Sequence, residues 1–542
     1  MAVIDGYWLS LHRFFLLGAV AVSLGVFVRF LDDETKRRVR GRLFLGVPWG
    51  TLVVAGVVVC VYLFVQNGLA HPRSPTVVPY RSWSYFYPLG VLVSSFAHAD
   101  LGHLLGNLVA TLTLGALAEY AWGHFPRERG VQTFRTLRTD PFARVGAFVG
   151  ASLFVAVLTG AFALGPSVGF SGVVFAYAGF ALLRYPVGTL VALYVGDLLS
   201  LGYDALRRPL LTQGGRPGYL TPWWADIAIQ GHALGLFLGA LLGAVLFAAR
   251  DERPPAARVW GGALLFVVSQ GLWAVYLPRS GSVFTLYRAV GVGLAFAIAV
   301  LLASASRASD RTLVDRLDLS DREASFGTVL AVVLALSVVA VPFNFFVVAD
   351  AEAGVGEDNS LEVGDYTVFY TESVANQYVS TVEVGSLTSA AAVNASGVIV
   401  VNEERHIWWE VVSTDRLAFD GTSEVHVGGL GWRETVSVNR TGWEVVGNDT
   451  AATVHLEHED RRTLAHTDDP LRAEPTVAGR NVTVVPGERF TLRVSNGGEP
   501  LGTAALPTAE QSTSTAGLTF TRSGSRLYAE TSDTRVRIAT RE

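Results

Sequence analysis

The stretch "ALGPSVGFSGVVFAYAGF", residues 163–180, is apolar enough to lie in a membrane, yet it starts unlike an ordinary spanning helix. It contains one proline, four glycines and two serines. Glycine permits unusual backbone dihedrals, and proline breaks a helix except in its first turn. We therefore expect a loop that enters the membrane and becomes helical at the tetrapeptide "GFSG", residues 169–172.

The composition indicates two parts with different solvents. Half of the 542 residues are hydrophobic and only 16% are charged, so most of the apolar surface is expected to face lipid. Residues 1–350 hold 27 Arg and Lys against 19 Asp and Glu, whereas residues 351–542 hold 15 against 28. This asymmetry predicts a membrane part and an acidic, water-facing tail that join near Asp350. The single cysteine, Cys60, cannot form an internal disulfide.

The membrane part is expected to be polytopic and α-helical, because ten segments approach the length of about 20 apolar residues that crosses a bilayer. These segments are 8–28, 45–65, 101–122, 145–164, 169–183, 187–203, 226–248, 259–277, 284–304 and 326–348. The first one has no small-residue cleavage site, which favours a retained helix over a signal peptide.

The loops between these segments predict the orientation, because Arg and Lys concentrate on the cytoplasmic side. Alternate loops carry 19 basic residues in one set and 6 in the other. The basic set is placed inside, which puts the loop at 165–168 and the tail outside the cell membrane. Four glycosylation sequons support this orientation, since all of them fall in the tail, at Asn394, Asn439, Asn448 and Asn481.

Two polar side chains are expected at the same depth near the outer interface, Ser171 and His232. The stretch "GHALGLFLGALLG", residues 231–243, has a glycine every four residues, which allows two helices to approach closely. An imidazole at that depth can accept the proton of a serine hydroxyl. The alternative is that Ser171 only bonds a backbone carbonyl or a neighbouring helix. An α/β-hydrolase elbow is excluded, because position 173 is valine and no strand precedes it.

A second polar pair, His103 and Asn107, lies four residues apart on one helix face. Both side chains can donate hydrogen bonds to a developing oxyanion, which is usually the largest single contribution to acyl-transfer catalysis. The alternative is a pair that only ties loops together.

At these motifs the chain resembles the rhomboid intramembrane serine proteases. The resemblance covers a six-helix core at residues 45–249, with about four extra helices around it. It rests on three motifs. The pattern H-x4-H-x3-N-x7-G-x3-E consists of His98, His103, Asn107, Gly115 and Glu119. The motif GxSG contains Gly169, Ser171 and Gly172, and the motif G-H-x-x-G contains Gly231, His232 and Gly235.

The resemblance implies that Ser171 is the nucleophile and His232 the general base of a Ser-His dyad. It implies that His103 and Asn107 form the oxyanion hole with the Ser171 backbone amide, and that the remaining matched positions are structural. Phe175 stands where the family commonly has a tyrosine that stacks on the catalytic histidine. Arg81 and Trp83 occupy a place similar to the family's Trp-Arg pair in the outer loop.

The tail, residues 350–542, is expected to be an extracellular all-β region. Short Val- and Thr-rich runs such as "SGVIVVN" and "RFTLRVS" alternate with Gly, Asn and Pro, a pattern typical of a β-sandwich. The run "HLEHED", residues 455–460, suggests a metal site at first sight. On a strand, however, His455 and His458 point to opposite faces, so we expect a solvated edge and no metal.

The chain is thus expected to divide into an extra helix with a basic loop (1–44), a rhomboid-like core (45–249), three further helices (250–349) and the β region (350–542). Its expected function is an intramembrane serine endopeptidase that cleaves transmembrane protein substrates near the outer interface. The alternative is a non-catalytic membrane scaffold with a binding β-sandwich; a transporter is less well supported, since few carboxyl groups lie inside spans. Membrane lipid is an expected partner, and an extracellular protein or glycan is a candidate ligand of the β region. No cofactor and no nucleic acid are expected.

Overall fold

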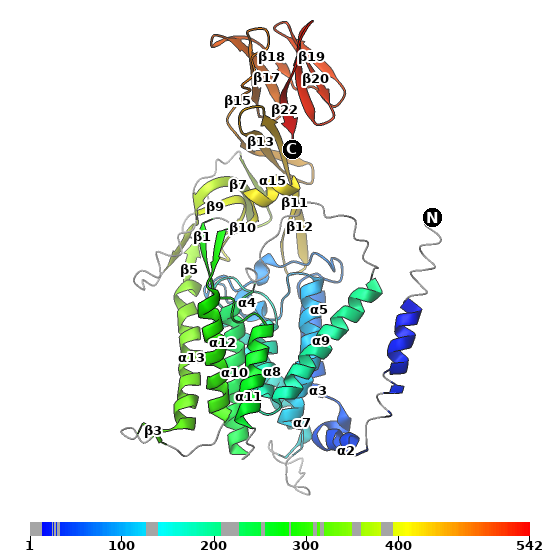
Figure 1. Ribbon diagram of the computed structural model, residues 1–542, viewed down its shortest axis with the longest axis vertical. Helices are drawn as coiled ribbons and strands as arrows, with labels where there is room; N and C mark the ends of the chain where they lie inside the picture. Colours follow the sequence, from blue (N-terminus) through cyan, green and yellow to red (C-terminus); the bar gives the residue numbers. More distant parts are fainter. Residues whose placement is uncertain are drawn as a thin grey trace. The chain divides into compact units, whose positions relative to one another are not determined.

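The fold is seen in a computed structural model, which divides into two compact units, Met1–Phe345 and Phe346–Glu542 (Figure 1). The predicted boundary at 349/350 lies four residues beyond this division. The structure describes residues 13–23, 25–26, 29, 33–125, 139–207, 227–250, 255–280, 283–306, 312–314, 319–348, 359–380 and 394–542. The predicted junction at Asp350 and the start of the first predicted span, residues 8–12, lie outside these ranges.

Within the described ranges of the first unit, six helices are long and apolar enough to cross a membrane. They are Leu101–Trp122 (α5 Leu101–Ala110, a π-helical turn at Thr111–Gly115 and α6 Ala116–Trp122), α7 Pro141–Ala161, α9 Pro186–Arg207, α10 Ile229–Ala249, α12 Arg288–Ser306 and α13 Asp321–Asn344. Four shorter apolar helices complete the ten predicted positions, at Arg13–Ser23, Trp49–Val65 (α3 Trp49–Cys60 and a π-helical turn at Val61–Val65), α8 Ser171–Leu182 and α11 Ala256–Ser269.

Helix α8 is shorter than expected for a spanning segment. Its 12 residues rise about 18 Å, against about 30 Å for the hydrocarbon core of a bilayer. Gly165 and Gly169 have positive φ angles of +80° and +126°, so the chain ahead of Ser171 is not helical. The stretch 163–180 therefore forms a loop followed by a short helix that starts at the serine.

Local sequence signals explain where several helices begin. The Asp100 side chain accepts a hydrogen bond from the His103 N–H at the start of α5, and Asp140 caps α7 in the same way. Ser320 and Glu323 form a capping box ahead of α13. Among the described residues of this unit, the helices α2 Asp33–Arg42 and α4 Pro88–Ser94 were not predicted. Nor were the paired strands β1 Tyr276–Ser280 with β2 Val283–Leu286 and β3 Thr312–Val314 with β4 Leu319–Ser320.

Close packing of α8 against α10 depends on small residues, as expected from the glycine spacing. A methyl group on Gly235 or Gly239 would overlap the carbonyl oxygens of Gly172 and Ala176, and one on Gly179 would overlap the Leu236 carbonyl. The expected continuous glycine groove is, however, interrupted at its start. Gly231 has no such neighbour, since the nearest atom to an added methyl group is the Ala228 Cβ at 4.0 Å.

The second unit is built from antiparallel sheets. One has the strand order β10-β9-β7-β6, from β6 Ser360–Val363, β7 Tyr366–Ala375, β9 Asn394–Asn402 and β10 Ile407–Ser413. The largest has the order β14-β13-β12-β22-β21-β20-β19 with β11 paired to β12, from β11 Thr422–Gly429, β12 Trp432–Val445, β13 Thr450–His458, β14 Arg461–Thr467, β19 Ser512–Thr515, β20 Leu518–Ser523, β21 Arg526–Glu530 and β22 Arg535–Arg541. A third sheet joins β15 Leu471–Arg472, β16 Asn481–Val485, β17 Thr491–Asn496 and β18 Glu499–Ala505. In its described residues the C-terminal region is all-β apart from one short helix, α15 Thr414–Asp420.

The expected solvated edge at His455 and His458 is wrong. Strand β13 lies between β12 and β14, and both histidines are buried. Their ring nitrogens lie 3.6 Å from two different carboxylates, of Glu488 and of Glu434. The two imidazoles have different carboxylate neighbours, as expected for side chains on opposite faces of a strand, but both are buried and neither lies at a sheet edge.

Candidate active site

Ser171 is the first residue of α8, and the loop ahead of it is fastened to the segment 81–94. Arg81 donates a hydrogen bond to the Pro166 carbonyl at 3.0 Å. The Ser82 hydroxyl accepts one from the Ser167 N–H at 3.0 Å. The Gly169 N–H donates to the Ser94 carbonyl at 2.9 Å. These bonds hold the backbone on the N-terminal side of the serine.

His232 lies in the first turn of α10, and its Nε2 is 2.8 Å from the Ser171 Oγ. The two residues are 61 positions apart in the chain, so this contact depends on the packing of α8 against α10. In the described part of the chain the other ring nitrogen, Nδ1, is buried without a hydrogen-bond partner. Among the described residues, the arrangement is therefore a serine–histidine pair without a carboxylate behind it.

The imidazole of His232 lies flat against Phe175. The ring centroids are 4.3 Å apart and the planes differ by 9°. Phe175 in turn makes an edge contact with Phe266 of α11, at a centroid distance of 5.6 Å. A helix beyond the predicted core thus supports the ring that orients the histidine.

His103 and Asn107 meet the loop at Gly169. A methyl group on this glycine would come within 2.7 Å of Cε1 and Nε2 of His103 and 3.7 Å of the Asn107 Nδ2. The backbone N–H of Ala99 donates a long hydrogen bond (3.5 Å) to the His103 Nδ1, which leaves Nε2 as the protonated nitrogen beside the glycine. The Asn107 Nδ2 is buried and has no hydrogen-bond partner among the described residues. Two N–H donors therefore lie next to the loop that leads into Ser171.

His98 is buried behind this pair. Its ring meets that of His103 at a centroid distance of 5.0 Å and an interplanar angle of 69°. The Gln66 side chain bonds both the N–H and the carbonyl of His98, each at 2.8 Å. The resemblance gives His98 a structural position, and in the fold it holds the His103 ring from one side.

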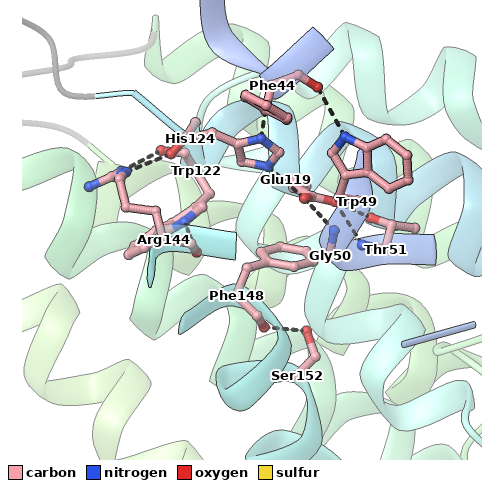
Figure 2. A network of polar contacts seen from close by, with 11 residues as sticks. Phe44, Trp49, Gly50, Thr51, Glu119, Trp122, His124, Arg144, Phe148 and Ser152 are labelled. Atoms are coloured by element: carbon pink, nitrogen blue, oxygen red, sulfur yellow. Dashed lines mark hydrogen bonds and ion pairs between the residues drawn. The ribbon is translucent and has the colours of Figure 1, made fainter. Parts of the chain in front are cut away.

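Glu119 belongs to a separate polar network at the start of α3 (Figure 2). Its carboxylate accepts hydrogen bonds from the N–H groups of Gly50 and Thr51, both at 2.7 Å, and from the Thr51 hydroxyl at 2.8 Å. The His124 Nε2 lies 2.6 Å from the same carboxylate, and the Phe44 N–H donates to the other ring nitrogen of His124 at 2.9 Å. Glu119 thus accepts hydrogen bonds from N–H groups that the start of α3 would otherwise leave unpaired.

Two amide side chains near the site were missed by the sequence reasoning. Gln230 donates to the carbonyls of Phe162 and Leu336, both at 2.8 Å, and accepts from the Leu164 N–H at 3.0 Å. Asn344, near the end of α13, donates to the carbonyls of Ala161 and Ala163, both at 3.0 Å. Both amides bond the backbone between α7 and Ser171. Gln230 precedes the G-H-x-x-G motif, whereas no sequence signal marks Asn344.

One group in the β region has side chains suited to a metal. Ligand atoms of Glu372, His466 and Asp468 lie within 4.8 Å of one another. The His466 Nε2 is 2.9 Å from the Asp468 carboxylate and 3.8 Å from that of Glu372. The hydrogen bond with Asp468 raises the pKa of His466, against burial, which lowers it. A protonated imidazole between two carboxylates satisfies this group without a metal.

No protein-family model, no curated protein and no solved structure matches the chain.

Proposed function

We propose that the chain is an intramembrane serine endopeptidase of the rhomboid type, which cleaves transmembrane protein substrates near the outer membrane interface. One observation carries the proposal: the His232 Nε2 lies 2.8 Å from the Ser171 Oγ. A nucleophile needs a base within hydrogen-bond reach, and this pair meets that condition. The sequence motifs that resemble the rhomboid family provide independent support.

In the proposed reaction, the Ser171 Oγ attacks the carbonyl carbon of the scissile peptide while the His232 Nε2 accepts its proton. The new C–O bond moves the carbonyl electron pair onto oxygen. When the C–N bond breaks, His232 donates the proton to the leaving amine and an acyl-serine remains. A water molecule then attacks the acyl group with His232 again as base, which releases the acid and regenerates the hydroxyl.

Three donors are proposed for the oxyanion. The Asn107 Nδ2 and the His103 Nε2 flank Gly169, two residues before the nucleophile. The third is the Ser171 N–H, which has no partner within its own helix because α8 starts at this residue. The positive end of the α8 dipole also favours negative charge at this place.

The proposed location of the chemistry is the outer side of the cell membrane. It rests on the basic loops, which carry 19 Arg and Lys in the set taken as cytoplasmic and 6 in the other. The same orientation exposes the acidic β region outside the cell, where an extracellular protein or glycan is its candidate ligand. The β region contributes none of the proposed catalytic residues.

The test combines substitution with a serine-reactive label on the full-length protein in liposomes. Ser171→Ala and His232→Ala are each expected to abolish cleavage of a single-pass test substrate, and the double variant is expected to be little worse than either. Asn107→Ala should retain weak activity, since one oxyanion donor is worth about 10²–10³ in rate. A fluorophosphonate should label the wild type and leave Ser171→Ala unlabelled.

Ser200→Ala is a matched control, because Ser200 lies on the exposed surface of α9. It should be labelled and should cleave as the wild type does. Cleavage or labelling that persists in Ser171→Ala would refute the protease and favour the scaffold alternative.

A further inference from the structure

A cavity of about 1310 Å³ opens from the catalytic pair into the helical unit. Ser171 and His232 line one end of it. Its long walls come from α10, α12 and α13, of which α12 and α13 lie outside the segment 45–249. The described lining is mostly aliphatic and aromatic, for example Phe237, Leu301 and Val332. The space therefore favours an apolar occupant that reaches the nucleophile.

The cavity is elongated along these helices, which Figure 1 shows running side by side. Lining residues on α13 extend from Leu336 to Ala324, and those on α12 from Leu294 to Ser304. At 1.5 Å per residue these separations correspond to about 18 Å and about 15 Å. The Leu336 carbonyl accepts a hydrogen bond from Gln230, which lies two positions before His232 in the chain. Leu336 therefore lies at the end of the cavity that holds the catalytic pair.

The length suits a helix. About 18 Å along α13 corresponds to about 12 residues of a docked helix. Small residues on each wall face the space, at Ala228, Gly231, Ala297, Ser304, Ala324 and Ser325. Small residues are typical of surfaces against which a transmembrane helix packs.

We propose that this cavity is the docking site for the transmembrane helix of a protein substrate. The docked helix lies between α10, α12 and α13, and one of its ends reaches Ser171 and His232. This assignment rests on the proposed protease function and adds the route by which the substrate meets the dyad. It makes α12 and α13 part of substrate recognition.

Photocrosslinking tests the occupant directly. Full-length Ser171→Ala protein in liposomes carries benzoylphenylalanine either at Ala297, which lines the cavity, or at Val292, which is exposed on α12 and does not line it. The probe is a single-pass peptide with about 20 apolar residues. We expect crosslinks to the peptide from position 297 and few from 292. Equal crosslinking from both positions, or lipid as the only product at 297, overturns the docking site.

Cavity-filling variants provide the kinetic arm. Ala297→Trp and Thr328→Trp should lower kcat/KM for the single-pass peptide at least about 10-fold through KM, which corresponds to about 1.4 kcal/mol of lost binding. Their labelling by a small fluorophosphonate should stay within about 2-fold of wild type. Val292→Trp and Leu334→Trp, on exposed positions of the same helices, are the matched controls.

The two proposals fail differently. Wild-type kcat/KM in both cavity-filling variants, with Ser171 still labelled, overturns the docking site and leaves the protease. If the fluorophosphonate does not label the wild type and the wild type cleaves no substrate, the protease proposal is overturned. The crosslink between position 297 and the peptide then shows separately whether the cavity binds a helix.

Discussion

Phe175 stacks on His232 with ring centroids 4.3 Å apart, and Phe266 contacts the Phe175 ring edge-on at a centroid distance of 5.6 Å. Where the rhomboid resemblance leads one to expect tyrosine, this chain keeps the aromatic face without the hydroxyl. The stack helps to fix the orientation of the imidazole, because no described residue bonds the His232 Nδ1.

We expect Phe175→Leu to lower kcat for a single-pass substrate by about 2- to 10-fold, since aromatic stacking is worth about 0.5–1.5 kcal/mol. Phe175→Tyr should keep the stack and stay close to wild type. Steady-state kinetics with a thermal melt of each variant separate this effect from loss of folded protein. A Leu variant that is as active as the Tyr variant would show that stacking does not orient the base.

The proposed protease function predicts that Gly169→Ala lowers turnover by about 10²–10³-fold. The added methyl group would meet the ring of His103, a proposed oxyanion donor, at 2.7 Å and displace it. Gly165→Ala is the matched control, because Gly165 also has a positive φ, of +80°, but has no atom within 4 Å of the added methyl. It should lose about 1 kcal/mol of stability and keep its turnover. Equal activity losses in the two variants would assign the effect to backbone strain and not to His103.

Gly239→Ala should destabilise the helical unit, because the methyl group overlaps the Ala176 carbonyl and forces α8 and α10 apart. Overpacking of this kind costs about 1–3 kcal/mol. Gly261→Ala in α11 has open space at the same kind of helical position and should melt at or above the wild-type temperature. Melting temperatures of the two variants in one detergent check this. A Gly239→Ala protein as stable as Gly261→Ala would mean that the helices can separate without cost.

The ion pair of His466 with Asp468 should stabilise the β region in a defined pH window. Burial alone raises the pKa of Asp468, but hydrogen bonds from His466 and from the Ala452 N–H lower it below its ordinary value. The raised pKa of His466 gives stability that is complete below about pH 6.5 and is lost as pH rises through the folded value. The lowered pKa of Asp468 gives stability that is complete above about pH 4 and is lost as pH falls.

His466→Gln should therefore cost most stability near pH 5 and progressively less above pH 6.5. Hydrogen exchange of the β14 amides, corrected for the intrinsic rate, measures this difference. Asp468→Asn should weaken the same pH dependence, since it removes the nearer of the two carboxylates beside His466. A cost of His466→Gln that is constant from pH 5 to pH 9 contradicts a protonated pair.

Much of the fold could be predicted from the sequence because its determinants are local. A run of apolar residues long enough for a bilayer predicts a helix wherever it occurs, and the span predicted at 101–122 coincides with the helix Leu101–Trp122. Alternating Val and Thr between turn residues predicted the β region for the same reason. The four-residue spacing of glycines predicted which face of α10 packs closely, and Gly235 and Gly239 do so.

Other features were beyond the sequence because they join distant segments. Asn344 bonds the Ala161 carbonyl across 183 positions, and an asparagine inside an apolar helix carries no mark of that partner. The burial of His455 depends on which strands flank β13, and alternation along one strand does not specify its neighbours. The same distinction applies to the candidate site. Residue types and spacing marked Ser171 and His232 as candidates. Only the packing of α8 on α10 brings the Ser171 Oγ and the His232 Nε2 to 2.8 Å, and only the arrangement of α10, α12 and α13 forms a cavity beside them.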